Sequence, residues 1–267
     1  MMRFIAVTCA LMAVTVFAVA PPAMPASGPA VSYVMRVVDR SDPACTAARD
    51  RCPSVTLRFP VFTQAPTTAA RQALNRTVST FMLKDFLGKP RGTVDAVIAD
   101  FFQEAGEERR LNPQIPPWFL ERTVAVTFNA QGIVSLRFGE GSFTGGAHPN
   151  SWEDLRSYSA LSGRRLALRE LLVPGFEPKL NAIAERHFRK ERGLAPNDDL
   201  EAEGFTFKGG KFGLNDNFMI TAKGLTFRFN SYDVAPYVLG PTEFVVPYAE
   251  IRHLVRPTGP LAAVVRR

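Results

Sequence analysis

The stretch Thr123-Val-Ala-Val-Thr-Phe-Asn-Ala-Gln-Gly-Ile-Val-Ser-Leu-Arg-Phe138 carries the clearest fold signal of the sequence. Apolar residues alternate with small or polar ones on both sides of a turn at residues 129–132. A period of two predicts strands that are buried on one face, so we expect a β-hairpin here. The apolar positions are Val124, Val126 and Phe128 before the turn, and Val134, Leu136 and Phe138 after it.

Three other segments have the three- and four-residue apolar spacing of amphipathic helices. They are residues 67–87, residues 93–106, and a segment around residues 180–188 that ends at Gly193. Further strands are expected at residues 55–59, 152–159, 218–221, 225–229 and 244–246. Because helices interrupt hairpins instead of alternating with single strands, we expect an α+β fold with antiparallel sheets and three main amphipathic helices. Residues 107–110 are expected to form an exposed connection, and residues 257–267 a flexible tail with little to bury.

The first 26 residues have the three-part organisation of a secretory signal peptide. Arg3 gives a short positive segment, the stretch from Phe4 to Ala20 carries no charge, and small residues and prolines follow up to a cleavage position near Ala26. An uncleaved anchor is the alternative, because the apolar stretch is at the short limit for spanning a bilayer. We therefore expect a periplasmic or secreted protein that contacts the membrane only if this segment is kept.

Two cysteines, Cys45 and Cys52, follow the signal segment. In an oxidising compartment such a close pair is most simply a disulfide, with free thiols as the alternative. A redox or metal role would need a CxxC spacing or further ligands, and the sequence has neither, so no metal and no cofactor are expected.

The formal net charge is +7. Outside the cytosol, positive charge favours anionic partners such as lipid headgroups or acidic polymers. The alternative is a soluble surface with a modest cationic excess. The compartment argues against nucleic acid as a partner.

A glycine-rich loop is expected at residues 139–150, and within it Thr144, Gly145, Gly146 and His148 form a candidate ligand-binding site. Two adjacent glycines permit positive φ and can aim successive N–H groups at an anion or a carbonyl beside the imidazole. The alternative is a tight turn in which His148 only hydrogen-bonds the backbone. Since no G-x-S-x-G elbow supplies a nucleophile, no catalytic residue is expected.

A second candidate is the segment Tyr232-Asp-Val-Ala-Pro-Tyr237-Val-Leu-Gly240, which connects two expected strands. Tyr232 and Tyr237 suit a binding loop, because each combines apolar area with a hydroxyl group. They suit equally well a plug over the edge of a sheet.

Read together, these two loops resemble a known family of exported domains. Phe143-Thr-Gly-Gly-Ala-His148 is similar to the aromatic-T-G-G-A-H signature of the RsiV-like family, and the segment from Gly224 to Tyr248 is similar to its C-terminal block. The resemblance covers about residues 118–256. Phe59-Pro60, followed by the helix that contains Ala73-Leu74-Asn75, is similar to the PdaC-like module that precedes this domain.

The resemblance implies two small packed α+β subdomains, at residues 31–140 and 141–256. RsiV is a lysozyme-sensing anti-sigma factor whose outer domain binds lysozyme, and the PdaC-like module accompanies a peptidoglycan deacetylase. Because only three residues precede the apolar run, and no acid-and-two-histidine metal set is in view, neither output is expected here.

We therefore expect an exported, non-catalytic binding protein of the cell envelope. Its expected ligand is a glycan, a peptidoglycan fragment or a glycan-cleaving protein such as lysozyme. The expected binding surface includes His148, Tyr232 and Tyr237. Two alternatives remain: a hydrolase with His148 as general base, and a structural envelope protein.

Overall fold

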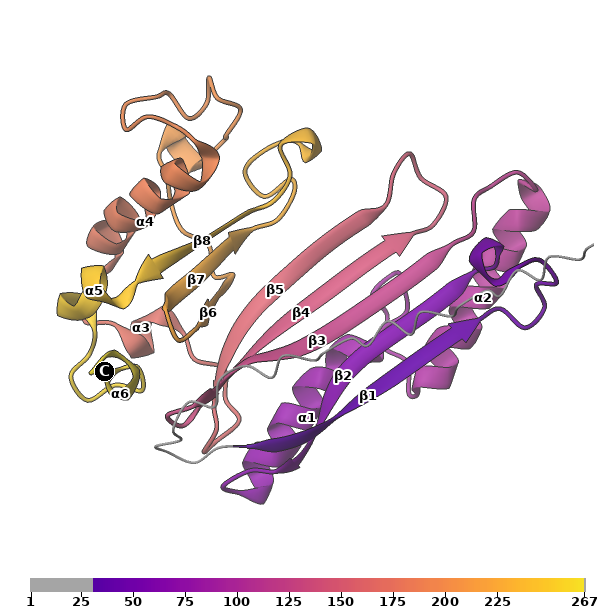
Figure 1. Ribbon diagram of the computed structural model, residues 1–267, viewed down its shortest axis with the longest axis horizontal. Helices are drawn as coiled ribbons and strands as arrows, with labels where there is room; N and C mark the ends of the chain where they lie inside the picture. Colours follow the sequence, from indigo (N-terminus) through magenta and orange to yellow (C-terminus); the bar gives the residue numbers. More distant parts are fainter. Residues whose placement is uncertain (1–30, 267) are drawn as a thin grey trace, which may run out of the picture.

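The computed structural model describes residues 31–266, which form two β-sheets with helices packed on them (Figure 1). The predicted signal peptide at residues 1–26 lies outside these residues. The strands are β1 (Ser32–Ser41), β2 (Ser54–Gln64), β3 (Phe119–Ala130), β4 (Ile133–Phe143), β5 (Asn150–Ser159), β6 (Phe218–Ile220), β7 (Gly224–Phe229) and β8 (Thr242–Pro247). The helices are α1 (Thr68–Met82), α2 (Val94–Leu111), α3 (Leu168–Leu171), α4 (Glu177–Arg192), α5 (Tyr248–Ile251) and α6 (Ala262–Val265).

The larger sheet has the strand order β1-β2-β3-β4-β5, and its neighbours pair antiparallel except for β2 and β3, which are parallel. The parallel pair is possible because α1 and α2 carry the chain back between the two strands. The predicted hairpin is confirmed as β3–β4, with Val124 opposite Phe138. Gln131 and Gly132, the two central residues of its turn, both have a positive φ. This conformation gives a two-residue turn the twist that matches the twist of the flanking strands.

Helices α1 and α2 cover one face of the larger sheet (Figure 1). The first hydrophobic core lies between this face and the two helices. Of the alternating positions expected from the sequence, this core contains Val124, Val134, Leu136 and Phe138, whereas Phe128 lies in the second core. From the helices, the core receives Leu74, Val78, Phe81, Val97, Ile98 and Phe101, which are the stripe residues that the sequence predicts. The glycines at positions 139 and 141 continue β4, so the loop expected at residues 139–150 is shorter and spans residues 144–149.

Three local predictions differ from the structure. Strand β1 was not expected, because its sequence does not alternate; it is an edge strand exposed on both faces. Helix α1 ends at Met82 instead of residue 87. The residues after Met82 form a turn that is closed by backbone hydrogen bonds of Asp85. Helix α2 continues through Gly106 and through the expected exposed connection at residues 107–110, since Glu and Arg are good helix formers and the first proline comes only at residue 113.

The smaller sheet, with the order β6-β7-β8, packs against α4 and forms a second hydrophobic core rich in phenylalanine. Side chains connect it to the larger sheet. The Ser135 and Ser157 hydroxyls lie 2.8 Å apart, and they bond the backbone C=O and N–H of Ile220 at 2.7 and 2.8 Å. The side-chain amides of Asn217 and Asn230 bond the outward backbone groups of β5 at residues 153 and 155. These side chains thus provide hydrogen-bond partners for backbone groups of β5 that have no neighbouring strand, because β5 is the last strand of the larger sheet.

An ion network also links the two sheets. Arg137 of β4 pairs with Glu153 at 2.5 Å and with Glu243 of β8 at 2.6 Å. Arg228 of β7 lies 3.2 Å from both carboxylates. Burial alone raises the pKa of Glu243, but the hydrogen bonds and charges of the two arginines more than offset burial and hold this pKa below its ordinary value.

The fold class is the predicted one: α+β, with largely antiparallel sheets and three main amphipathic helices, α1, α2 and α4. The boundary expected between residues 140 and 141 falls inside β4, which belongs to the larger sheet together with β5. The segment expected to be a flexible tail differs in the structure: it forms α6 and buries Leu261, Ala262 and Val265 in the second core.

Candidate functional site

The two candidate loops meet in space. Residues 144–149 connect β4 to β5, and Tyr232 and Tyr237 lie in the connection between β7 and β8. The rings of His148 and Tyr237 stack with their centroids 3.9 Å apart and their planes 21° from parallel. The Tyr232 ring lies 5.8 Å from that of Tyr237. The structure therefore brings together three of the six predicted ligand-binding residues. We call these three residues, His148, Tyr232 and Tyr237, the loop surface.

One carbonyl group holds the stacked pair in place. The Tyr237 hydroxyl donates to the Pro149 carbonyl oxygen at 3.0 Å, and His148 Nδ1 lies 2.8 Å from the same oxygen. Since a carbonyl oxygen only accepts, Nδ1 carries a proton in this arrangement and Nε2 is left for a ligand or for solvent. Both rings are thereby ordered before any ligand binds.

Each of the two loops contains a residue with a positive φ. Gly145 has φ +90°, and a Cβ atom there would lie 2.4 Å from the side chain of Ile115 and 3.3 Å from Trp118 Nε1. Only glycine fits both this conformation and this close approach. Tyr232 has φ +72°, which is rare for a residue with a side chain, and its N–H donates to the Ala235 carbonyl at 3.0 Å.

The loop surface is accessible and partly apolar. Tyr232 is 65% exposed and Tyr237 36%, and the following Val238 is 87% exposed. Beside these rings is a shallow hollow of about 650 Å³, lined by Gly145, Gly146 and His148 together with residues of the connection before β3. Thr144 is half-buried and does not line this hollow, so it is the one predicted residue that joins neither feature.

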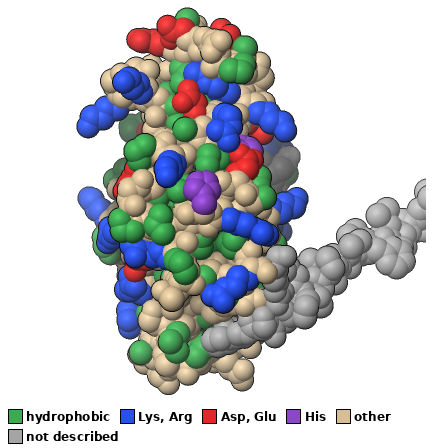
Figure 2. Space-filling view, turned by 90° about the vertical axis from the view of Figure 1, so that its left-hand side faces the viewer, with side chains coloured by type: hydrophobic (Ala, Val, Ile, Leu, Met, Phe, Trp, Pro, Cys, Tyr) green, Lys and Arg blue, Asp and Glu red, His purple; other side chains and the backbone are tan. Residues whose placement is uncertain are grey.

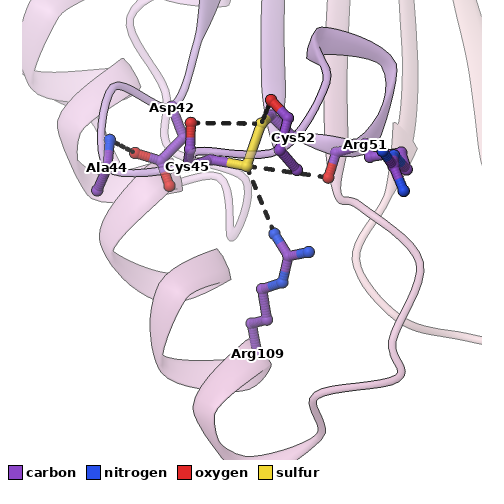
Figure 3. Close-up of a disulfide and its surroundings, with 7 residues drawn as sticks. Asp42, Ala44, Cys45, Arg51, Cys52 and Arg109 are labelled. Carbon is purple, nitrogen blue, oxygen red and sulfur yellow. Dashed lines mark hydrogen bonds between the residues drawn. A yellow bond between two sulfur atoms is a disulfide. The ribbon is translucent and has the colours of Figure 1, made fainter.

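The predicted disulfide is present. Cys45 and Cys52 are bonded, with their Cα atoms 5.7 Å apart, in the connection between β1 and β2 (Figure 3). Arg109, near the end of α2, directs its guanidinium at Cys45 Sγ from 3.6 Å. The bond therefore fixes a loop beside the end of a helix. It lies at the same end of the larger sheet as the loop at residues 144–149, because Ser54 pairs with Phe119 and Phe119 pairs with Phe143.

A second concavity was not predicted from the sequence. It has a volume of about 830 Å³ and lies between α1 and β5, on the helix-covered face of the larger sheet. Arg76, Lys84, Trp152 and Arg165 contribute to its lining. One signal could have indicated it: the helix-facing row of β5 reads Trp152, Asp154, Arg156 and Tyr158, whereas the matching row of β4 is apolar from Val134 to Phe138.

Other features restrict the candidate chemistry. No three His, Cys, Asp or Glu side chains among residues 31–266 gather in a way that could hold a metal ion. No helix in this described part is long and apolar enough to cross a lipid bilayer. Figure 2 shows the end of the molecule that carries α4, α5 and α6, where Lys and Arg side chains are spread over the face instead of forming one patch. The positive net charge thus does not by itself mark a binding site at that end.

Two family models match the chain in succession. Residues 47–151 match the family described as deacetylase PdaC, and residues 169–249 match the family described as a protein of unknown function, DUF3298. The expected PdaC-like module followed by a second domain is thereby confirmed, whereas the link to RsiV remains a prediction. Together with the disulfide, these domains are consistent with an extracellular or periplasmic protein. No curated protein matches the chain.

Solved structures of the DUF3298 family share the fold. One, from Bacteroides fragilis, is 17% identical, with a TM-score of 0.69, and the match covers 89% of this chain and 98% of that one. Another, from Pseudomonas aeruginosa, is 20% identical, with a TM-score of 0.66, and the match covers 85% of this chain and 95% of that one. At these identities the likeness concerns the fold alone.

Proposed function

We propose that this protein is an exported, non-catalytic binding protein of the cell envelope that holds a glycan strand on the loop surface of His148, Tyr232 and Tyr237. The observation that carries this proposal is the stacked and partly exposed pair of rings, fixed by a single backbone carbonyl. The PdaC and DUF3298 matches support the envelope as the setting.

The chemistry of the loop surface suits a saccharide. Aromatic faces provide flat apolar area against which the C–H face of a sugar ring can pack, and the phenol hydroxyls at their edges can bond sugar hydroxyls. Because the rings are already ordered, binding costs little additional side-chain entropy. The exposed Val238 next to Tyr237 extends the apolar area along a chain-like ligand.

Binding suits this surface better than hydrolysis. A general base needs the reacting group within hydrogen-bond reach, and usually a partner that orients its ring. In the described residues, the only hydrogen-bond partner of the His148 ring is the Pro149 carbonyl, and one ring face is covered by Tyr237. No hydroxyl or carboxylate side chain in this part of the chain is bonded to the imidazole. Hydrolysis with His148 as base therefore remains the alternative, without a nucleophile beside it.

A pull-down against purified peptidoglycan sacculi at low salt tests the proposal. We expect retention of the wild-type protein, and loss of retention for Tyr237→Ala and His148→Ala. Removing an aromatic residue at the centre of a binding surface typically weakens binding by about 30-fold or more. Tyr33→Ala is the matched control, since Tyr33 has the same 36% exposure but lies on β1.

The same variants distinguish the rival ligand. Immobilised lysozyme provides a second arm, in which the positive net charge of both proteins opposes association. Retention by lysozyme but not by sacculi would replace the glycan with a protein ligand. Equal retention of wild type and Tyr237→Ala on sacculi would remove the loop surface from the proposal.

A further inference from the structure

The groove between α1 and β5 has the size of a small-molecule site. Its volume of about 830 Å³ lies within the range of about 300–1,000 Å³ that is usual for ligand pockets. One wall is α1, with Ala73 and Thr77, and the floor is the helix-facing row of β5. The groove exists because the helix-facing row changes from apolar on β4 to polar and aromatic on β5, so α1 finds no apolar surface to cover there.

A tight turn closes one end of the groove. Gly163 has φ +69°, and a Cβ atom there would lie 2.6 Å from Ala73 Cβ and 2.7 Å from the Ala70 carbonyl oxygen. The turn after β5 is therefore pressed directly onto α1. The Thr67 hydroxyl, which caps α1, also donates to the Leu161 carbonyl at 3.1 Å. These contacts fix the distance between the wall and the floor of the groove.

The charge of the groove is positive, and its cations are only partly paired. Five basic and two acidic side chains line it. Both acids are already neutralised: Arg122 binds Glu140 at 2.6 Å, and Arg91 binds Asp85 at 3.1 Å. A further lining arginine, at position 156, pairs with the carboxylate at position 154.

Three cations remain for a ligand. Arg76 and Arg165 are exposed and Lys84 is half-buried, and none of the three forms an ion pair among residues 31–266. Arg165 donates to the Asp216 carbonyl at 2.9 Å, which orients its guanidinium and leaves its other donors available.

An aromatic face lies in the same groove. Trp152 is 37% exposed, although its indole is anchored edge-to-face on Phe81 at 5.6 Å. Phe81 is itself buried and packs on Phe138 at 5.4 Å. A rigid, accessible indole beside unpaired cations is suited to a ligand that has both a ring with an apolar face and several negative charges.

We infer that this groove is a second binding site, separate from the loop surface, and that it takes an anionic saccharide. A sugar ring packs on Trp152, and carboxylates or phosphates of the saccharide pair with Arg76, Lys84 and Arg165. The inference does not depend on the proposed function of the loop surface, because no residue of that surface lines the groove.

Isothermal titration calorimetry of the whole exported chain with three probes separates ring from charge. Tetragalacturonate has rings and carboxylates, chitotetraose has rings alone, and tetrapolyphosphate has charge alone. We expect tetragalacturonate to bind most tightly, with an affinity that falls as the salt concentration rises. A phosphorylated tetrasaccharide in a fourth titration shows whether carboxylate or phosphate is preferred.

Matched variants locate the site. The triple variant Arg76→Ala/Lys84→Ala/Arg165→Ala is expected to bind tetragalacturonate roughly tenfold to hundredfold more weakly. The control Arg36→Ala/Arg58→Ala/Lys223→Ala removes three exposed charges elsewhere and is expected to retain most of the affinity.

Two further variants complete the test. Trp152→Ala, with Trp152→Phe as the variant that keeps an aromatic face, is expected to weaken both saccharides but not tetrapolyphosphate. The Trp152 and triple variants report on the groove, whereas Tyr237→Ala in the sacculus pull-down reports on the loop surface, so a failure of one site is distinguishable from a failure of the other. Equal losses in the two triple variants would overturn the inference, as would tetrapolyphosphate binding as tightly as tetragalacturonate.

Discussion

Replacing Arg122 with alanine should cost this protein a large part of its stability. Arg122 lies on β3, is 2% exposed, and binds Glu140 through Nε at 2.6 Å. Its two terminal nitrogens donate to the carbonyl oxygens of Met82 and Asp85, at 3.4 and 3.1 Å, and to that of Lys84. One guanidinium therefore satisfies the carbonyl groups at the end of α1 and in the turn that follows.

The expected magnitude follows from what the substitution leaves behind. Without the guanidinium, three carbonyl groups and the Glu140 carboxylate, which is only 16% exposed, lose their partner at the base of the groove. Removing one member of a buried ion pair typically costs about 3–5 kcal/mol. Since domains of this size are stable by only about 5–15 kcal/mol, the loss is a large fraction of the total.

Urea denaturation followed by circular dichroism measures this loss as a shift in midpoint at a constant slope. Arg122→Lys is the informative companion, because lysine keeps the charge but lacks the planar fork, so its stability should fall between wild type and Arg122→Ala. Arg58→Ala removes an exposed arginine from the neighbouring strand and should change stability by less than about 0.5 kcal/mol. A loss below about 1 kcal/mol for Arg122→Ala would refute the role given to this side chain.

Three further predictions concern stability. Replacing Cys45 and Cys52 together by serine should lower the unfolding free energy by about 2.5 kcal/mol on the loop-entropy model. Reductant should bring the wild type to the same urea midpoint. Equal midpoints for the oxidised and the reduced wild type would contradict this prediction. The folded-state pKa of Glu243 lies below its ordinary value, so its ion pairs stabilise the fold above the ordinary carboxyl pKa and lose this effect as pH falls through the folded value. Glu243→Gln should show a shallower loss of stability in acid titrations by circular dichroism, and an unchanged profile would count against it. Gly163→Ala should destabilise by more than Gly175→Ala, since both have positive φ but only position 163 has helix backbone 2.7 Å from the added Cβ; thermal melts of equal midpoint would disprove the close approach.

The sequence predicted the core elements because their patterns were unambiguous. The β3–β4 hairpin alternates over most of its length, with a register shift between Val126 and Phe128, and the stripes of α1, α2 and α4 follow the helical period. The predictions were wrong where tertiary contacts determine the local structure. Strand β1 is ordered by pairing with β2 and not by its own pattern, and Leu261 is buried only because the chain returns to the second core.

The candidate site shows the same division. The loop surface could be proposed because each loop contains a local motif, with Gly145 before His148 in one and two tyrosines in the other. The stacking of His148 on Tyr237 depends on the hydrogen bond from Tyr237 to Pro149. These two residues are 88 positions apart in the chain, and no local pattern encodes their contact. The groove was not predicted, because Arg76 and Arg165 belong to distant segments that carry no motif; the polar and aromatic row of β5 is the one local signal for it.

The closed edge of β5 limits how this protein can polymerise. Besides the amides of Asn217 and Asn230, the segment around Arg164 bonds the backbone of β5 at residues 157 and 159, so an incoming strand finds no free ladder along residues 153–159. In the described residues, the larger sheet then has one open edge, β1, which carries Arg36 and Asp39 among its apolar residues. Charged side chains on such an edge discourage pairing. Two copies joined through β1 would use up both open edges, so fibril growth through this sheet would stop at a pair.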